Sequence, residues 1–149
     1  MASVLWALLG VLAGAFISIQ APINAKLSAG LGLPTAASGS SFLVGAIVLA
    51  IISLVVSRFQ GITIAWSVPA PWLFIAGGCL GAAYVTSAVI LIPRLGAAAT
   101  MAFVVSGQLL AGMLIDRVGF LGVAVREISL GRAAGAILLL AGALMIRIY

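Results

Sequence analysis

The chain has 149 residues, of which 65% are hydrophobic and only 6% are charged, and its mean hydropathy is +1.41. Soluble domains carry about 25% charged residues, so this composition excludes a soluble globular protein and indicates an integral membrane protein. The formal net charge of +5 comes from seven Lys and Arg residues that stand singly. Because nucleic-acid binding requires clustered basic residues, we expect no nucleic-acid partner.

Five segments are long and apolar enough to cross the hydrocarbon core of a bilayer, which takes about 20 residues per helix. They run from Ser3 to Ile19, with an extension to Lys26 left open, and then over Thr35–Val56, Trp72–Ile92, Gly96–Ile115 and Ser129–Arg147. No series of segments alternates at period two, as a closed barrel would require. We therefore predict an all-α membrane protein, a single domain of five transmembrane helices over residues 1–149.

The ends of these segments carry local signals. Pro93 and Arg94 are expected to close the third helix, Asp116 and Arg117 the fourth, and Ser129 is a suitable N-cap for the fifth. Residues 1–25 contain no Lys or Arg, so the basic region of a signal peptide is absent and the first helix is expected to be retained.

Reacting groups are scarce. The chain has no histidine and one cysteine, Cys79, which stands in an apolar stretch and is expected to be buried. Neither Asp116 nor Glu127 lies well inside a helix, and we expect Asp116 to pair with Arg117 or Arg132 or to face water. Without a carboxylate pair, a metal-ligand cluster or a phosphate loop, we expect no enzyme, no catalytic residue, no metal and no cofactor.

Small residues recur at a spacing of four, which lets membrane helices approach one another closely. Packing and coincidence both remain open for each set. The sets are Gly10, Gly14 and Ser18; Gly77 and Gly81; and Gly131 and Gly135.

The basic residues barely distinguish the two sides of the membrane. With five helices, one side receives Arg58, Arg117, Arg126 and Arg132, and the other receives Lys26, Arg94 and Arg147. Orientation follows an excess of Lys and Arg on cytoplasmic loops, and four against three is almost no excess. Two interpretations remain: one weakly specified orientation, or insertion in both orientations with pairing into an antiparallel homodimer. The balance favours the homodimer.

Polar side chains interrupt the end of the first segment. Gln20 and Asn24 share a helix face because they are four residues apart. Pro22 lies between them and removes a backbone donor. Such a stretch either lines a cavity inside the membrane or is the ordinary end of a helix that leaves the bilayer.

Two further polar residues lie near the middle of predicted helices. Gln108 stands beside Ser106 and Gly107 in the fourth segment, and its amide requires a hydrogen-bond partner there. Tyr84 stands in the third segment, where its hydroxyl also requires a partner. For Gln108 the alternatives are contact between helices or contact with a substrate, and for Tyr84 they are core packing or the wall of a pocket.

Five stretches, in this order, resemble the YdcZ-like family: "QAPINAKL", "GGCLGAAYV", "LIPRLGAAAT", "VSGQLLAGMLIDRVG" and "LGRAAGAILLLAGALMIR". This family of five-helix bacterial inner-membrane proteins belongs to the drug/metabolite transporter superfamily. The resemblance implies an exporter of unassigned substrate that occurs as a dual-topology homodimer, as an oppositely oriented pair or as a fused ten-helix protein. The polar residues that it carries over are Gln20, Asn24, Tyr84, Arg94, Gln108 and Asp116. The related small multidrug resistance proteins carry a glutamate in their first helix, which this chain lacks.

From these observations we predict a multi-pass protein of the bacterial inner membrane that transports a small molecule by alternating access at an antiparallel dimer interface. The partners would be the substrate, the lipid bilayer and a second copy of the chain. The candidate substrate-binding residues are Gln20, Asn24, Tyr84 and Gln108. The alternatives are a structural or regulatory membrane subunit that does not transport, or a passive pore.

Overall fold

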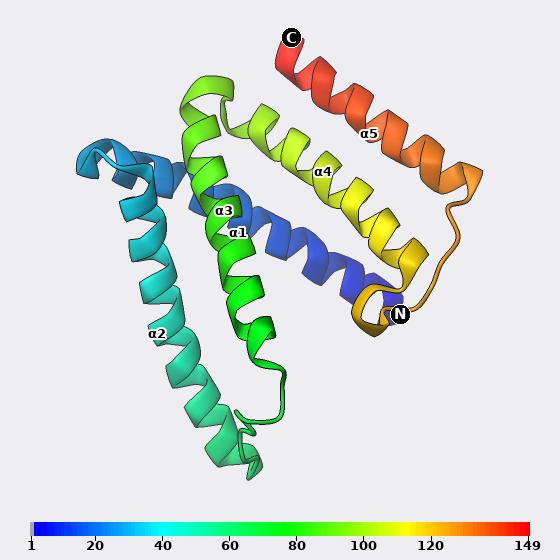
Figure 1. The fold of residues 1–149 in the computed structure, drawn as a ribbon. Coiled ribbons are helices and arrows are strands. Elements are labelled where there is room, and N and C mark those ends of the chain that lie inside the picture. Colours follow the sequence, from blue (N-terminus) through cyan, green and yellow to red (C-terminus); the bar gives the residue numbers. More distant parts are fainter. Residues whose placement is uncertain (1) are drawn as a thin grey trace. The chain divides into compact units, whose positions relative to one another are not determined.

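Five α-helices make up most of the computed structural model, which describes residues 2–149, with side chains from Val4 onward (Figure 1). The helices are α1 (Ala2–Leu31), α2 (Pro34–Gln60), α3 (Pro71–Leu95), α4 (Ala97–Val118) and α5 (Leu130–Ile148), with a short 3₁₀ helix, η1 (Phe120–Gly122). Among the described residues, all five α-helices are long and apolar enough to cross a membrane. The all-α prediction with five membrane helices is therefore confirmed.

Two helices run further than their apolar stretches predict. The helix α1 continues through Pro22 to Leu31, and α3 continues through Pro93 to Leu95. A proline in a helix removes one backbone donor, yet both helices end at a glycine with positive φ. Gly32 has φ 75° and Gly96 has φ 81°, a conformation that glycine adopts without strain. The glycine, and not the proline or the last apolar residue, sets each end.

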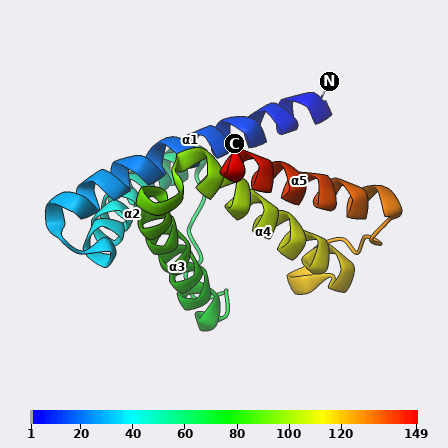
Figure 2. The ribbon, with the colours of Figure 1, turned by 90° about the horizontal axis from the view of Figure 1, so that it is seen from above.

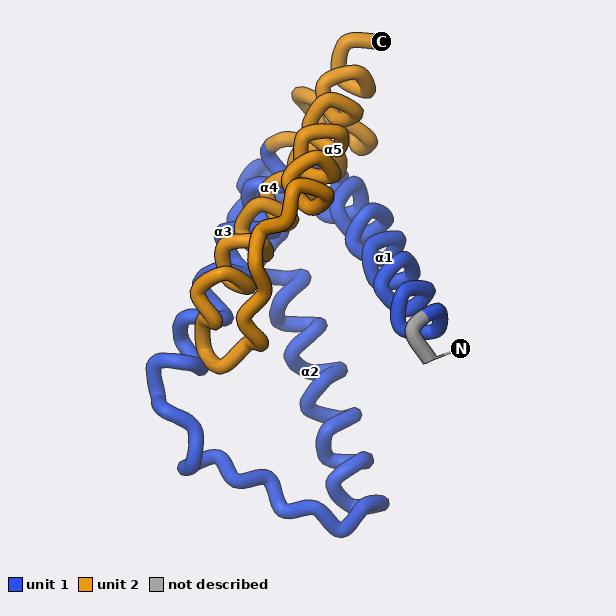
Figure 3. The backbone as a smooth tube through the Cα atoms, turned by 90° about the vertical axis from the view of Figure 1, so that its right-hand side faces the viewer, with its two compact units in different colours: residues 1–90 blue, residues 91–149 orange. Residues whose placement is uncertain are grey.

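The chain consists of two compact units, residues Met1–Ile90 and Leu91–Tyr149 (Figure 3). The first unit contains α1, α2 and most of α3, and α1 packs against α2. The second unit contains the end of α3 together with α4, η1 and α5, and α4 packs side by side with α5 (Figure 2).

The buried side chains are small. Most of the buried apolar residues are alanines, whereas large apolar side chains are exposed along every helix, as expected for surfaces that face lipid. The buried apolar set is Ala21, Ala37, Ala88, Val89, Ala99, Met113, Ala136 and Ala143. Cys79 does not belong to it. Its predicted burial is wrong for the isolated chain, because the side chain is exposed on α3.

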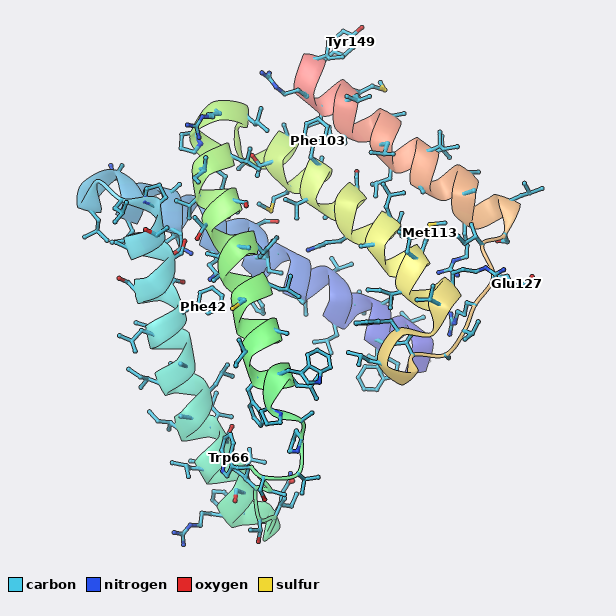
Figure 4. The ribbon with its side chains drawn as sticks, in the orientation of Figure 1. Phe42, Trp66, Phe103, Met113, Glu127 and Tyr149 are labelled. Carbon is cyan, nitrogen blue, oxygen red and sulfur yellow. The ribbon has the colours of Figure 1, made fainter. Side chains whose placement is uncertain are left out.

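The first unit also contains a close contact between α2 and α3. Phe42 on α2 points toward α3 (Figure 4), where a Cβ atom built on Gly81 would lie 3.1 Å from its ring. Gly77 has no atom within 4 Å of such a Cβ atom. The spacing of small residues in α3 therefore includes one position, Gly81, at which a neighbouring helix comes close.

An ion pair in the second unit joins α4 to α5. The Arg132 guanidinium donates to the Asp116 carboxylate and, at 3.3 Å, to the backbone carbonyl of Glu127. The predicted N-cap is confirmed, since the Ser129 hydroxyl accepts a hydrogen bond from the Arg132 backbone N–H at 3.3 Å. Of the partners expected for Asp116, Arg132 is the one that the structure selects.

Candidate functional site

Gln20 and Asn24 both point from α1 to one hydroxyl on α2. The amide Nε2 of Gln20 donates to the Ser41 Oγ at 3.1 Å, and the Asn24 Nδ2 donates to the same oxygen at 3.3 Å. Asn24 is buried and Gln20 is exposed. The shared helix face predicted for the two amides is thus realised, and that face contacts α2.

A second polar contact ties α3 to α2. The Thr86 hydroxyl donates to the Ser38 Oγ at 3.0 Å, and the Ser38 hydroxyl donates to the backbone carbonyl of Pro34 at 3.1 Å. Ser38 is almost completely buried, so both of its hydrogen-bonding roles are satisfied within the protein.

Tyr84 lines a small cavity between α1 and α3. The cavity has a volume of about 10 Å³ and is lined by Ile17, Gln20, Ala21, Asn24, Tyr84, Val85 and Ala88. The Tyr84 hydroxyl oxygen is buried and has no hydrogen-bond partner among the described residues. Leaving a buried hydroxyl unpaired costs about 1–3 kcal/mol, and among the buried side-chain atoms of the described residues this oxygen is the one without a partner.

A larger groove runs between α1 and α2. It has a volume of about 320 Å³ and is lined by Gln20, Ser41, Phe42, Gly45, Ala46 and Leu49. Its wall is mostly apolar, and Gly45 and Ala46 supply little side-chain volume. Gln20 lines both the groove and the cavity that contains Tyr84.

The first unit by itself brings together three of the four predicted site residues, Gln20, Asn24 and Tyr84. Gln108 belongs to α4 in the second unit. It is exposed in the isolated chain, so its amide is not among the buried groups that require a partner within the protein.

Ser38 and Ser41 were not predicted as site residues from the sequence. Both lie in the run "SGSS" at residues 38–41, near the start of α2. Three hydroxyl groups within four residues of a membrane helix are a polar signal of the same kind as Gln20 and Asn24. Hydroxyl side chains in a membrane helix, and not amides alone, therefore indicate this contact.

The polar side chains of the first unit described above form an electrically neutral cluster. It consists of two amides and four hydroxyl groups, those of Gln20, Asn24, Ser38, Ser41, Tyr84 and Thr86. Both side-chain carboxylates of the chain, Asp116 and Glu127, belong to the second unit. Within residues 2–149, no group of His, Cys, Asp and Glu side chains could hold a metal ion. The cluster can therefore donate and accept hydrogen bonds, but it contains no group that exchanges a proton near neutral pH.

One comparison with known proteins identifies the family. The model of the family described as "Putative inner membrane exporter, YdcZ" matches residues 5–145, nearly the whole chain. The chain belongs to this family. The YdcZ description agrees with the five membrane-crossing helices and makes the protein a multi-pass protein of the inner membrane. Searches of curated proteins and of solved structures find no match.

Proposed function

We propose that this member of the YdcZ family exports a small molecule by alternating access at the interface of an antiparallel homodimer. The substrate contacts Gln20, Asn24, Tyr84 and Gln108 near the membrane midplane. Each copy supplies the same residues in opposite orientation, as inverted repeats do in many transporters. No metal, cofactor or catalytic residue takes part.

The buried Tyr84 hydroxyl is the observation that carries this proposal. It lies beside two amides in a cavity between membrane helices, and it lacks a partner among the described residues. In hydrocarbon an unpaired polar group is costly. A hydroxyl that is buried and unpaired gains a hydrogen bond when a ligand opens the cavity to it, and the family description of an exporter makes a transported small molecule the expected ligand.

The exposed apolar surface and the basic residues support the dimer. Large apolar side chains are exposed on all sides of α2, for example Leu43, Val44 and Leu49, so lipid or another chain covers them. The counts of Lys and Arg on the two sides of a five-helix topology are four and three, which specifies neither orientation strongly. Both features suit two copies inserted in opposite orientations.

The Ser41 contacts favour a second candidate, a membrane subunit that does not transport. Two amides that meet one serine hydroxyl across α1 and α2 form an ordinary interhelical contact. On this alternative, replacing a polar residue lowers the stability of the helix packing and changes no flux.

The orientation of the C-terminus is the first test of the proposal. A reporter fused after Tyr149 is assayed in intact cells, with green fluorescent protein reporting a cytoplasmic end and alkaline phosphatase a periplasmic end. Comparable populations on both sides are expected. A single orientation would contradict the antiparallel homodimer and would direct the search to an oppositely oriented partner chain.

The variant Gln108→Ala separates the exporter from the structural subunit. Cells that overproduce the chain are compared with cells that lack it, and the metabolites that the chain releases are the readout. We expect Gln108→Ala to abolish this release while insertion and dimerisation, measured by crosslinking, stay unchanged. Lost dimerisation would favour the structural subunit, and unchanged release would remove Gln108 from the site. Release that increases without saturation would indicate a passive pore.

A further inference from the structure

The cavity and the groove of the first unit meet at one residue. Gln20 forms part of the wall of both, so the cavity with Tyr84 adjoins the apolar groove along α2. One compartment is small and has polar side chains in its wall, and the other is about 320 Å³ and mostly apolar. Pockets for small molecules usually have about 300–1,000 Å³ and combine an apolar wall with a few polar groups.

We propose that the first unit binds an amphiphile with one small neutral hydroxyl head and an apolar body. The head occupies the cavity beside Tyr84, and the body lies along the groove formed by Phe42, Gly45, Ala46 and Leu49. This inference rests on the proposed function, because it names the substrate class for the same site.

The size of the cavity restricts the head to a single hydroxyl group. A volume of about 10 Å³ corresponds to about one water molecule. A phosphate, a sugar or a quaternary ammonium group is far larger. The charge of the wall restricts the head further, since none of the side chains that line the cavity is ionisable to a carboxylate or an ammonium group. An ionised head would lie unpaired there, at a large cost in free energy.

The hydrogen bonds within the cluster leave one buried position open. The Asn24 Nδ2 donates to the Ser41 Oγ, whereas the Tyr84 hydroxyl, which is buried, has no partner among the described residues and remains a donor. A hydroxyl head accepts the hydrogen bond of Tyr84, so one ligand atom satisfies the unpaired group.

The apolar body contributes packing and little selectivity. A body that enters the groove leaves the hydrocarbon of the bilayer, so it gains no hydrophobic free energy comparable to transfer from water. The groove accommodates it because Gly45 and Ala46 leave space beside the Phe42 ring. The preference for one amphiphile over another of equal length is therefore determined by the hydroxyl head.

The test compares decanol with undecane, which have equal numbers of heavy atoms, as ligands of the full chain in lipid nanodiscs. Phe42 is replaced by 4-fluorophenylalanine through site-specific incorporation, and its fluorine NMR shift reports occupancy of the groove. The measured quantity is the ligand concentration in the bilayer that gives half of the maximal change in the fluorine shift. We expect this concentration to be about 2- to 10-fold lower for decanol than for undecane, because decanol gains one net hydrogen bond. Equal responses to the two ligands would overturn the proposal.

The variant Tyr84→Phe keeps the ring and removes the hydroxyl, which has no partner among the described residues to lose, so we expect it to fold. It should abolish the preference for decanol and leave the response to undecane unchanged. Tyr149→Phe, at the only other tyrosine, is the control and should keep the preference. A preference that survives in Tyr84→Phe would refute the inference.

A second variant, Ala46→Leu, fills the groove and should weaken the responses to both ligands; unchanged responses would also refute the inference. These binding measurements require no flux. If the unmodified chain prefers decanol but exports nothing, only the proposed function is contradicted. If it exports a small molecule but shows no preference for decanol, only this inference is contradicted.

Discussion

Replacing Ser41 with alanine removes the oxygen on which two polar side chains of α1 depend. The Ser41 Oγ accepts from Gln20 at 3.1 Å and from Asn24 at 3.3 Å. The variant leaves the backbone of α2 and every apolar contact of the serine Cβ in place. Its effect on stability therefore reports the interhelical hydrogen bonds.

The two amides contribute unequally to the expected loss. Asn24 is 4% exposed, so its Nδ2 loses its partner without access to water, at a cost of about 1–3 kcal/mol. Gln20 is exposed and can turn to another acceptor. Polar contacts between membrane helices are worth about 0.6 kcal/mol on average and at most about 2 kcal/mol. We therefore expect Ser41→Ala to lower the free energy of unfolding by about 1–2 kcal/mol.

Ser40→Ala is a matched control. The Ser40 hydroxyl donates only to the Ala36 carbonyl of its own helix, at 2.9 Å, and the substitution changes helix propensity by the same amount as Ser41→Ala. Unfolding in mixed micelles is followed by circular dichroism at increasing fractions of denaturing detergent. We expect Ser40→Ala to change stability by less than about 0.5 kcal/mol.

Equal stabilities of the two serine variants would refute this reasoning. A double-mutant cycle adds a second criterion, since Asn24→Ala and Ser41→Ala remove the same hydrogen bond. The two changes should be less damaging together than their sum, with a coupling free energy of at least about 0.5 kcal/mol. Strict additivity would show that the two residues do not interact.

Three further substitutions test other contacts. Asp116→Asn, which weakens the ion pair to α5, should lower stability by no more than about 1 kcal/mol because the pair is partly exposed; Glu127→Gln keeps the backbone carbonyl that the same arginine contacts and should have no effect in thermal unfolding. Gly81→Val should destabilise by about 1–3 kcal/mol more than Gly78→Val, because only the first meets the phenylalanine ring of α2, and equal melting temperatures would contradict that contact. Ser129→Ala should cost about 1 kcal/mol and speed amide hydrogen exchange in the first turn of α5, and failure of Ser129→Asp to restore slow exchange would argue against the cap.

The number and nature of the helices are predictable from sequence because membrane spans follow from runs of apolar residues. The ends are less predictable. Gln20 and Pro22 signal an end to α1, but backbone hydrogen bonding continues to Gly32. Hydropathy reports where the bilayer ends, whereas the left-handed conformation of a glycine determines where the helix ends.

The candidate site is predictable only in part. Gln20, Asn24 and Tyr84 stand out as polar groups in apolar helices, and the structure brings them together in the first unit. Their partner Ser41 does not stand out, because a serine is common in membrane helices and a single sequence does not reveal which one faces a neighbouring helix. From the sequence, the four neutral residues are equally good candidates for substrate binding. The structure distinguishes Tyr84 from the others by its unpaired hydroxyl.

The small buried residues reverse the usual pattern of mutational tolerance. In a soluble protein, truncation of large core side chains is the damaging change. Here most of the buried positions already hold alanine, serine or threonine, as at Ala37, Ser38 and Thr100, so enlargement is the change that they resist. The large apolar side chains face outward and can exchange for one another as the chain evolves. Among members of the family, the small buried residues should therefore be conserved, while the large apolar residues on the outside should be substituted for one another.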